Sequence, residues 1–438
     1  MLCRDLGWVE PGAAFAALAG EAPLVFLDSA AAGDARARVS YIGLEPCAVL
    51  ELARADELPG WLAAARPADA ACPLDWPFPF KAGAMGWLGY GAGLTQAGIE
   101  SRHAPIPGLP EGWFGMFDLV LGFDYAARRL CVLAGDRPGQ GAQARIAALA
   151  ARLRRAAALP PGPQPDWREE TPRAAYEARV ERLRAYIGAG DVFQANFTAR
   201  FTAAPPSGFS AAGYYAALRR RSPAPFAAFI ETGCGAALCG ASPERFLSVT
   251  ATGAVETRPI KGTARREACP RADARAAAAL RDNPKERAEN LMITDLLRND
   301  LGQLCETGSV RVPELFAVER FAQAHHLVSA VTGQLRPGVG AADLLLACSP
   351  GGSITGAPKH RAMQIIDALE AGARGAYCGA LAWIGLDGAM DSAIIIRTMV
   401  ATPEWLYAQA GGGITWDSDP ASEYEEMMLK LSPLIAHG

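Results

Sequence analysis

The chain has 438 residues, half of them hydrophobic, and a formal net charge of −4 at pH 7. It is long enough for one large domain or two to three ordinary ones. Because no basic block is present, no nucleic-acid partner and no anionic membrane surface is expected. No apolar run approaches a membrane span, and the ten cysteines form no C-x-x-C pair. These features predict a cytoplasmic protein with reduced thiols.

The N-terminal part, residues 1–158, combines short apolar runs with turns. APLVFLDSA predicts a strand, and DLVLGFDYAARRLCVLAG predicts an antiparallel hairpin. A proline-rich connection, LPPGPQPDWREETP, follows at 159–172. It separates this part from a C-terminal part, residues 173–438.

The C-terminal part alternates groups of strands with helices. Helical spacing predicts one helix after Pro172, others at 285–304 and 359–371, and a last one from about 421. Strands are predicted in DVFQANFTARF, FAAFIETG, AALCGASPERFLSVT, AVETRPIKGT, AYCGALAWIGL, MDSAIIIRTMV and EWLYAQAGGGITW. Strands in runs, with helices between the groups, favour an α+β fold over repeating βαβ units.

One lysine differs from the usual solvated lysines of a protein surface. In ETRPIKGTARR, Lys261 follows an isoleucine at the end of a β-like run and leads into a Gly-Thr turn. This placement is either accidental or a way to hold an amine against a substrate.

Two predicted helices carry carboxylates. From Glu289, positions +3, +4, +7 and +8 are apolar, so this charge needs a salt bridge or a cation. Glu423 and Glu426 share one face at the start of the last helix, where acidic residues also interact with the helix dipole. Carboxylates from two helices, without clustered Cys or His, suit a hard cation such as Mg²⁺.

Two glycine-rich segments are typical of anion-binding backbone. SPGGSITGAPKHRAM leads into a helix, whose N-terminus favours a phosphate or carboxylate. It lacks the Lys-Ser/Thr of a Walker A loop, which excludes an NTPase of that class. In AGGGITWDS, Gly411, Gly412 and Gly413 come directly after a predicted strand, where they indicate either close backbone approach or a tight turn.

Nine segments in order resemble the chorismate-utilising enzyme family, which includes anthranilate, isochorismate, salicylate and aminodeoxychorismate synthases. They are GDVFQANFTARF, GASPERFL, TRPIKGTARR, RAENLMITDLLRNDLG, AHHLVSAVTG, SPGGSITGAPKHRAM, YCGALAWIG, IIIRTMV and AGGGITWDSDPASEYEEMMLK. They cover nearly all of 173–438, and FLDSA, GAMGWLGYG and FGMFD match more loosely before it. The resemblance implies one α+β body of antiparallel sheets stacked in a sandwich, with helices outside.

Within the family, PIKGT is similar to the aminodeoxychorismate synthase branch (component I), whereas anthranilate-forming relatives carry alanine at position 261. The resemblance implies that Lys261 attacks C2 of chorismate as the C4 hydroxyl leaves. Ammonia then attacks C4 and expels the lysine, giving 4-amino-4-deoxychorismate on the route to p-aminobenzoate and folate. Glu244 is implied as the general acid, which requires a raised pKa. Gln194 replaces the lysine base of water-adding relatives, which disfavours addition of water.

The resemblance also assigns the remaining roles. Glu289 and Glu426 would bind Mg²⁺, with Glu423 assisting through water, and the metal would bind the ring carboxylate. Substrate contacts are implied for Gly262, Thr263, His326, Ser353, Tyr377, Arg397, Gly411, Gly412 and Gly413. A partial match implies a tryptophan pocket at Ser29, Pro225, Phe226 and Ala227.

The sequence contains no glutaminase segment. The resemblance therefore implies a separate glutamine amidotransferase subunit that supplies ammonia, unless free ammonia is used. Two alternatives stay open: an anthranilate synthase large subunit, which would also eliminate pyruvate, and a non-catalytic homologue that holds chorismate or tryptophan. The joint presence of Lys261, Glu244, Glu289 and Glu426 disfavours the non-catalytic alternative.

Overall fold

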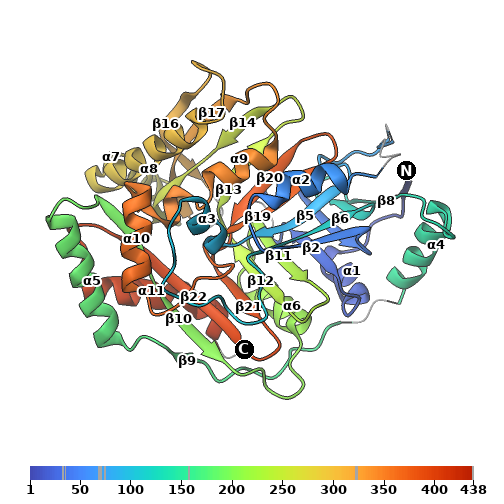
Figure 1. Ribbon diagram of the computed structural model, residues 1–438, viewed down its shortest axis with the longest axis horizontal. Coiled ribbons are helices and arrows are strands. Elements are labelled where there is room, and N and C mark those ends of the chain that lie inside the picture. The colour runs from blue at the N-terminus through green and yellow to red at the C-terminus, as the bar shows by residue number, and fades with distance from the viewer. Residues whose placement is uncertain are drawn as a thin grey trace.

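The computed structural model describes residues 1–31, 34, 36–67, 72–73, 75–155, 158–320 and 324–436. Within these residues the fold consists of two large antiparallel sheets, one of twelve strands and one of ten, with helices packed around them (Figure 1). The α+β fold and the sandwich of antiparallel sheets expected from the sequence are therefore confirmed.

The twelve-stranded sheet contains strands from before and after the proline-rich connection. Its strands are β1 (Leu2–Asp5), β2 (Leu24–Asp28), β3 (Val39–Leu44), β7 (Leu119–Asp124), β8 (Arg129–Ala134), β9 (Arg168–Glu169), β10 (Gln194–Ala203), β11 (Phe226–Glu231), β12 (Ala237–Ser242), β18 (Gly356–Ala357), β21 (Thr398–Ala401) and β22 (Leu406–Ile414). Their order is β1-β8-β7-β3-β2-β11-β12-β21-β22-β10-β18, and β9 pairs with β10. The β2–β11 pair joins the two parts of the chain.

The ten-stranded sheet is joined in the same way by the β5–β19 pair. Its strands are β4 (Ala48–Leu52), β5 (Gly83–Leu88), β6 (Gly112–Phe117), β13 (Arg245–Val249), β14 (Ala254–Thr257), β15 (Ile260–Arg265), β16 (Arg311–Arg320), β17 (Ala324–Gln334), β19 (Ala380–Gly385) and β20 (Met390–Ile394). Their order is β15-β17-β14-β13-β20-β19-β5-β6-β4, and β16 pairs with β17.

The helices begin at residues suited to that position. Asn283 accepts hydrogen bonds from two backbone amides of α8, and Asp419 accepts one from Ser422 of α11. In the described residues the helices are α1 (Pro11–Leu18), α2 (Glu57–Ala64), α3 (Tyr90–Gln96), α4 (Ala142–Leu153), α5 (Arg173–Gly188), α6 (Ala211–Arg221), α7 (Pro270–Asp282), α8 (Pro284–Gly302), α9 (Ala341–Cys348), the 3₁₀ turn η1 (Gly352–Ile354), α10 (Lys359–Leu369) and α11 (Pro420–Ile435). α5, α8, α10 and α11 confirm the four predicted helices.

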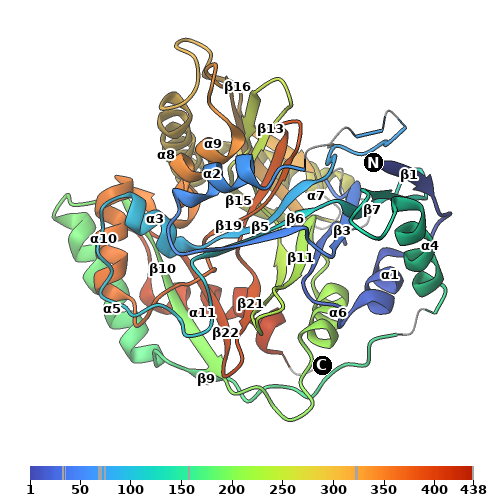
Figure 2. The same cartoon turned by 45° about the vertical axis from the view of Figure 1, so that its right-hand side comes forward.

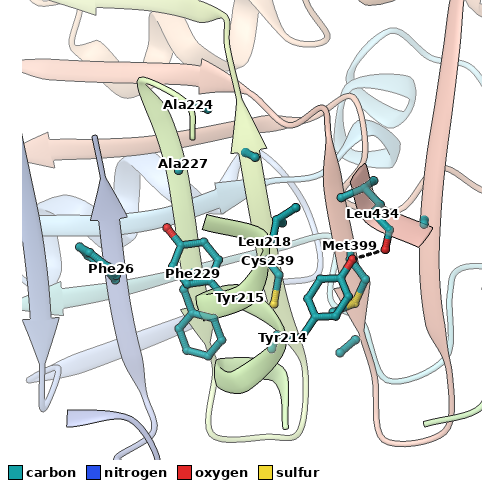
Figure 3. Packing of buried hydrophobic residues seen from close by; sticks show 14 of the residues in the cluster. Phe26, Tyr214, Tyr215, Leu218, Ala224, Ala227, Phe229, Cys239, Met399 and Leu434 are labelled. Atoms are coloured by element: carbon teal, nitrogen blue, oxygen red, sulfur yellow. Dashed lines mark hydrogen bonds between the residues drawn. The ribbon is translucent and has the colours of Figure 1, made fainter. Parts of the chain in front are cut away.

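Alternation along the strands produces three apolar layers. In β2, Val25 packs between the two sheets, whereas Phe26 packs against helices on the outer face. Figure 3 shows part of that outer layer, where Tyr214 and Tyr215 of α6 lie against β2, β11, β12 and β21. The Tyr214 hydroxyl donates to the carbonyl oxygen of Leu434 at 2.6 Å. Helices α2, α3, α8 and α9 cover the outer face of the other sheet.

One corner of the sandwich brings together elements that are far apart in the sequence. β10 and β22 run side by side over nine residue pairs, with α11 packed on β22 and β18 next to β10 at the edge. α8 packs against β15 (Figure 2) and against β17 of the other sheet. This corner contains most of the residues that the sequence singled out.

Candidate active site

A cavity of about 360 Å³ opens at this corner, within the size range of small-molecule sites. Strands from both sheets supply its walls. It is lined by Asn196, Pro243, Glu244, Ile260, Lys261, Thr263, His326, Ser353, Ile354, Tyr377, Ile396, Arg397, Gln409, Ala410, Gly411, Gly412, Gly413 and Lys430. Ten of the predicted catalytic and substrate-binding residues therefore share one cavity, and Gly262 lies beside Lys261 in the chain.

Lys261 reaches the cavity from an irregular part of β15. The pairing of β15 with β17 shifts register between Ile260 and Thr263, and Gly262 has a φ of +86°. Such a bulge changes the direction of neighbouring side chains. A Cβ at position 262 would lie 2.8 Å from Glu286 Oε2, the end of a side chain that can move, so it is the positive φ that favours glycine here.

Glu244 faces the same cavity from the turn between β12 and β13. Its Oε1 accepts a hydrogen bond from the Ser353 hydroxyl at 2.7 Å. Burial raises the pKa of Glu244, although Ser353 and the nearby Lys261 charge act in the opposite direction. A carboxyl group of raised pKa beside a lysine suits protonation of a leaving hydroxyl, and that role of Glu244 stays a prediction.

Arg397 is the cavity's candidate for binding an anion. Its backbone has a φ of +52°, uncommon for a residue with a side chain. In the part of the chain that the structure describes, no acidic side chain lies within salt-bridge distance of Arg397. A guanidinium stays charged at any ordinary pH, so Arg397 is available for a ligand carboxylate.

Two further predicted residues form a pair at the cavity edge. Thr263 Oγ1 lies 3.0 Å from His326 Nδ1, across the β15–β17 pairing. Burial lowers the pKa of His326, and the Arg36 charge lowers it further. A largely neutral imidazole can hold the Thr263 hydroxyl in one orientation without adding charge.

The three consecutive glycines at 411–413 do not lie where the sequence predicted them. Gly411, Gly412 and Gly413 lie inside β22 rather than after a strand, because the ladder with β10 continues through them. A Cβ on Gly411 would lie 2.1 Å from the backbone oxygen of Phe197. The close backbone approach inferred from the sequence is confirmed, and the tight-turn alternative is wrong.

The three predicted metal ligands lie beside the cavity rather than in its lining. Burial raises the pKa of Glu289 and of Glu423, and each has a further contribution from a neighbouring carboxylate. Burial also acts on Glu426, but the Lys430 amine at 2.6 Å outweighs it and lowers the pKa. Glu289 forms no salt bridge with any described lysine or arginine, so the arginine-pair alternative is not supported.

Repelling carboxylates from α8 and α11 are the oxygen donors that Mg²⁺ prefers. The described residues contain no group of three or more His, Cys, Asp or Glu side chains that could hold a metal ion by themselves. A magnesium ion on these carboxylates would need substrate and water to complete its ligands, and the metal stays a prediction.

Several residues of the site were not singled out from the sequence as functional. Glu286 lies against Gly262, and its charge raises the pKa of Glu289. Its position three residues before Glu289 on the same helix could have indicated that the two carboxylates are neighbours. Lys430 donates to the carbonyl oxygen of Gly411 at 2.9 Å. Asn196 and Gln409 bring side-chain amides to the wall, and only their strand alternation could have indicated this.

The four residues of the predicted tryptophan pocket gather at a second cavity, of about 70 Å³, between the sheets. Ser29, Pro225, Phe226 and Ala227 line it together with Trp383 and others. The Ser29 hydroxyl lies 2.7 Å from the carbonyl oxygen of Val39. The structure thus brings this set together, and tryptophan binding stays a prediction.

Comparison with known proteins gives a consistent result. The family model of chorismate binding enzymes matches residues 23–436. The chain is 44% identical over 357 residues to aminodeoxychorismate synthase component 1 of Klebsiella aerogenes, covering 82% of this chain and 77% of that protein. It is 40% identical over 447 residues to anthranilate synthase component 1 of Streptomyces coelicolor, covering 98% and 86%.

Among solved structures, anthranilate synthase component I from Streptococcus pneumoniae matches with a TM-score of 0.78 and 31% identity. The match covers 91% of this chain and 92% of that chain. The described helices include none that is long and apolar enough to cross a membrane. On the family match and these identities, the chain belongs to the chorismate-binding enzymes.

Proposed function

We propose that this enzyme converts chorismate and ammonia to 4-amino-4-deoxychorismate through a covalent intermediate on Lys261. The observation that carries the proposal is a lysine amine and a carboxyl of raised pKa in one cavity, Lys261 and Glu244. A nucleophile beside an acid is the arrangement that substitution of a ring hydroxyl needs.

In the first step the Lys261 nitrogen bonds to C2 of the ring. The two ring double bonds shift, the C4–O bond breaks, and the Glu244 proton leaves with the hydroxyl as water. In the second step ammonia attacks C4, the double bonds shift back, and the bond between C2 and the lysine nitrogen breaks. Each attacking nitrogen loses one proton, and Lys261 regains one as it leaves.

The other residues orient the ring. Arg397 and the backbone of β22 would bind the enolpyruvyl carboxylate, because a guanidinium forms paired hydrogen bonds with such a group. Glu289 and Glu426, with Glu423, would hold Mg²⁺, which supplies positive charge for the ring carboxylate when it is bound. The Thr263–His326 pair and Tyr377 close the remaining sides.

Ammonia would come from a glutamine amidotransferase partner. The Klebsiella relative is named as a component 1, which implies a second component in that enzyme. The isolated chain should use ammonium and not glutamine until such a partner is added. The product would serve the formation of p-aminobenzoate and folate.

One specific observation favours a second candidate, an anthranilate synthase large subunit. The Streptomyces coelicolor relative of that name matches 98% of this chain, a larger share than the aminodeoxychorismate synthase relative matches. The experiment is to incubate the purified chain with chorismate, MgCl₂ and ammonium, and to identify the product by mass and absorbance. Aminodeoxychorismate supports the proposal, anthranilate supports the second candidate, and no ammonium-dependent product contradicts both.

A further inference from the structure

The strand segment that carries Lys261 lies at the edge of its sheet and is interrupted by a bulge. Among the described strands, β15 pairs with β17 alone. The register of that pairing shifts between Ile260 and Thr263. Lys261 and Gly262 therefore lie together opposite a single residue of β17, Leu327. Because a bulged edge strand has few ladder bonds, other contacts have to fix the direction of the Lys261 side chain.

A carboxylate in the first turn of α7 holds the end of β15 beyond the bulge. Asp273 is 7% exposed, and its Oδ1 accepts a hydrogen bond from Arg266 Nε at 2.9 Å and from the backbone N–H of Glu267 at 3.0 Å. Both donors belong to the two residues that follow β15. The Arg266 and Glu267 hydrogen bonds lower the pKa of Asp273, so it accepts as an ionised carboxylate.

The same carboxylate is bonded to β17 through a histidine. His325 is fully buried, and its Nε2 lies 2.8 Å from Asp273 Oδ1. Because the ionised carboxylate has no proton to give, the Nε2–H of His325 is the donor. His325 lies opposite Ala264, three residues after Lys261, and its neighbour His326 lines the cavity. One carboxylate therefore joins α7, the end of β15 and the facing part of β17.

We propose that Asp273 and His325 are positioning residues for Lys261, which fix the end of β15 against β17 and thereby the direction in which the amine enters the cavity. This assignment rests on the proposed covalent role of Lys261. Neither side chain lines the cavity, so both act through the β15 backbone. A displacement of a reacting group by about 1 Å can cost about a hundredfold in rate. Binding of the ring should change little, since the β22 backbone that would hold its carboxylate belongs to the other sheet.

The test compares two substitutions of His325 in the full-length chain. His325→Leu removes the donor, whereas the side-chain amide of His325→Gln can donate to Asp273 from the place of Nε2. Adduct formation on Lys261 is followed by tryptic mass spectrometry with chorismate and MgCl₂, and kcat and the KM for chorismate are measured with saturating ammonium. His325→Leu should lower the adduct rate and kcat about tenfold and change the KM less than about twofold, and His325→Gln should restore both rates to within about threefold of wild type.

Two further variants separate positioning from general stability. Tyr214→Phe removes a buried hydrogen bond of 2.6 Å to Leu434 in the outer layer, so it should lower the Tm and leave kcat and KM unchanged. Asp273→Asn keeps the shape of the side chain but weakens its bonds to both strands, and should lower kcat at least about tenfold with little change in KM. If His325→Leu does not fold, Asp273→Asn decides. Amide hydrogen exchange should quicken at residues 263–267 in these two variants and stay unchanged in β22.

The outcomes distinguish this inference from the amination proposal. If wild type forms neither adduct nor ammonium-dependent product, the proposed function fails and the positioning role fails with it. If wild type aminates chorismate and folded His325→Leu and Asp273→Asn do so at the wild-type rate, only the positioning role is overturned, and the pair contributes to stability alone. A KM for chorismate that rises as much as kcat falls would also overturn it, because the pair would then act on binding.

Discussion

The cavities of about 70 Å³ and about 360 Å³ differ in whether an arginine at the wall has a carboxylate partner. In the cavity of about 70 Å³, Arg36 pairs with Asp34 at 2.7 Å. In the cavity of about 360 Å³, Arg397 has no acidic partner among the described residues. A satisfied network stabilises a fold, whereas fixed groups without partners indicate ligand chemistry. The comparison therefore favours the larger cavity as the place of the proposed chemistry.

The largest expected effect comes from Lys261. Lys261→Ala should lower amination by about a thousandfold or more, because the covalent route is lost. Its affinity for chorismate should change little, since Arg397 and the β22 backbone would still hold the carboxylates. Lys261→Arg should fail as well, because a guanidinium remains protonated and cannot attack.

The measurement is tryptic mass spectrometry after brief incubation with chorismate and MgCl₂ without ammonium. Wild type should carry an adduct on the PIKGT peptide, and Lys261→Ala should not. Lys81 is a partly exposed lysine that pairs with Asp387 outside the cavity, so Lys81→Ala is the matched control and should behave as wild type. Absence of adduct in wild type together with full turnover of Lys261→Ala would make Lys261 a bystander.

The next largest effect concerns the carboxylates beside the larger cavity. Activity should be lost in excess chelator and restored by MgCl₂. Glu289→Ala and Glu426→Ala should each lower it by roughly a hundredfold or more, because one ligand from each helix is removed. Glu425 is exposed on α11 and pairs with Arg173, so Glu425→Ala should have little effect on activity. Full turnover in chelator would contradict the metal assignment.

A smaller effect should appear in the pH dependence. Glu244 must be protonated to act, and burial raises its pKa, so kcat should fall as the pH rises through that pKa. The Ser353 hydroxyl stabilises the ionised form, so Ser353→Ala should raise the pKa of Glu244 further and move the fall to higher pH. Kinetic measurements between about pH 5 and 9, which lie above the ordinary pKa of a glutamate carboxyl, would measure the shift. A fall at unchanged or lower pH in Ser353→Ala would contradict the role of Glu244.

Local sequence patterns predicted the individual helices and strands better than they predicted which strands pair with each other. The helical spacing of α8 and the start of α5 after Pro172 were readable, since those signals are local in the chain. The pairing of β2 with β11 and of β5 with β19 was not, because it depends on packing between distant segments.

The site shows the same limit. Lys261 and Glu244 lie in recognisable motifs. Asn196 lies in the cavity wall because β10 pairs with β22, which places it beside Gly413. The sequence indicated three glycines after a strand, but their continuation as ladder residues depends on β10, more than two hundred residues earlier in the chain. Cross-strand partners are set by register, which a single strand does not specify.

The smallest expected effect tests whether the second cavity also binds a ligand. L-Tryptophan in about hundredfold excess over its dissociation constant would add about 2.7 kcal/mol to the free energy of unfolding, which for a chain of this size is a rise in Tm of a few degrees. Ala393→Leu, which faces the space between the sheets beside Leu381, would fill the cavity and should abolish the rise without changing the KM for ammonium, since β20 does not line the larger cavity. L-Phenylalanine is the control ligand. If tryptophan leaves the Tm unchanged in wild type at millimolar concentration, the gathering of Ser29, Pro225, Phe226 and Ala227 reflects packing between the sheets, and the contrast between the two cavities is complete.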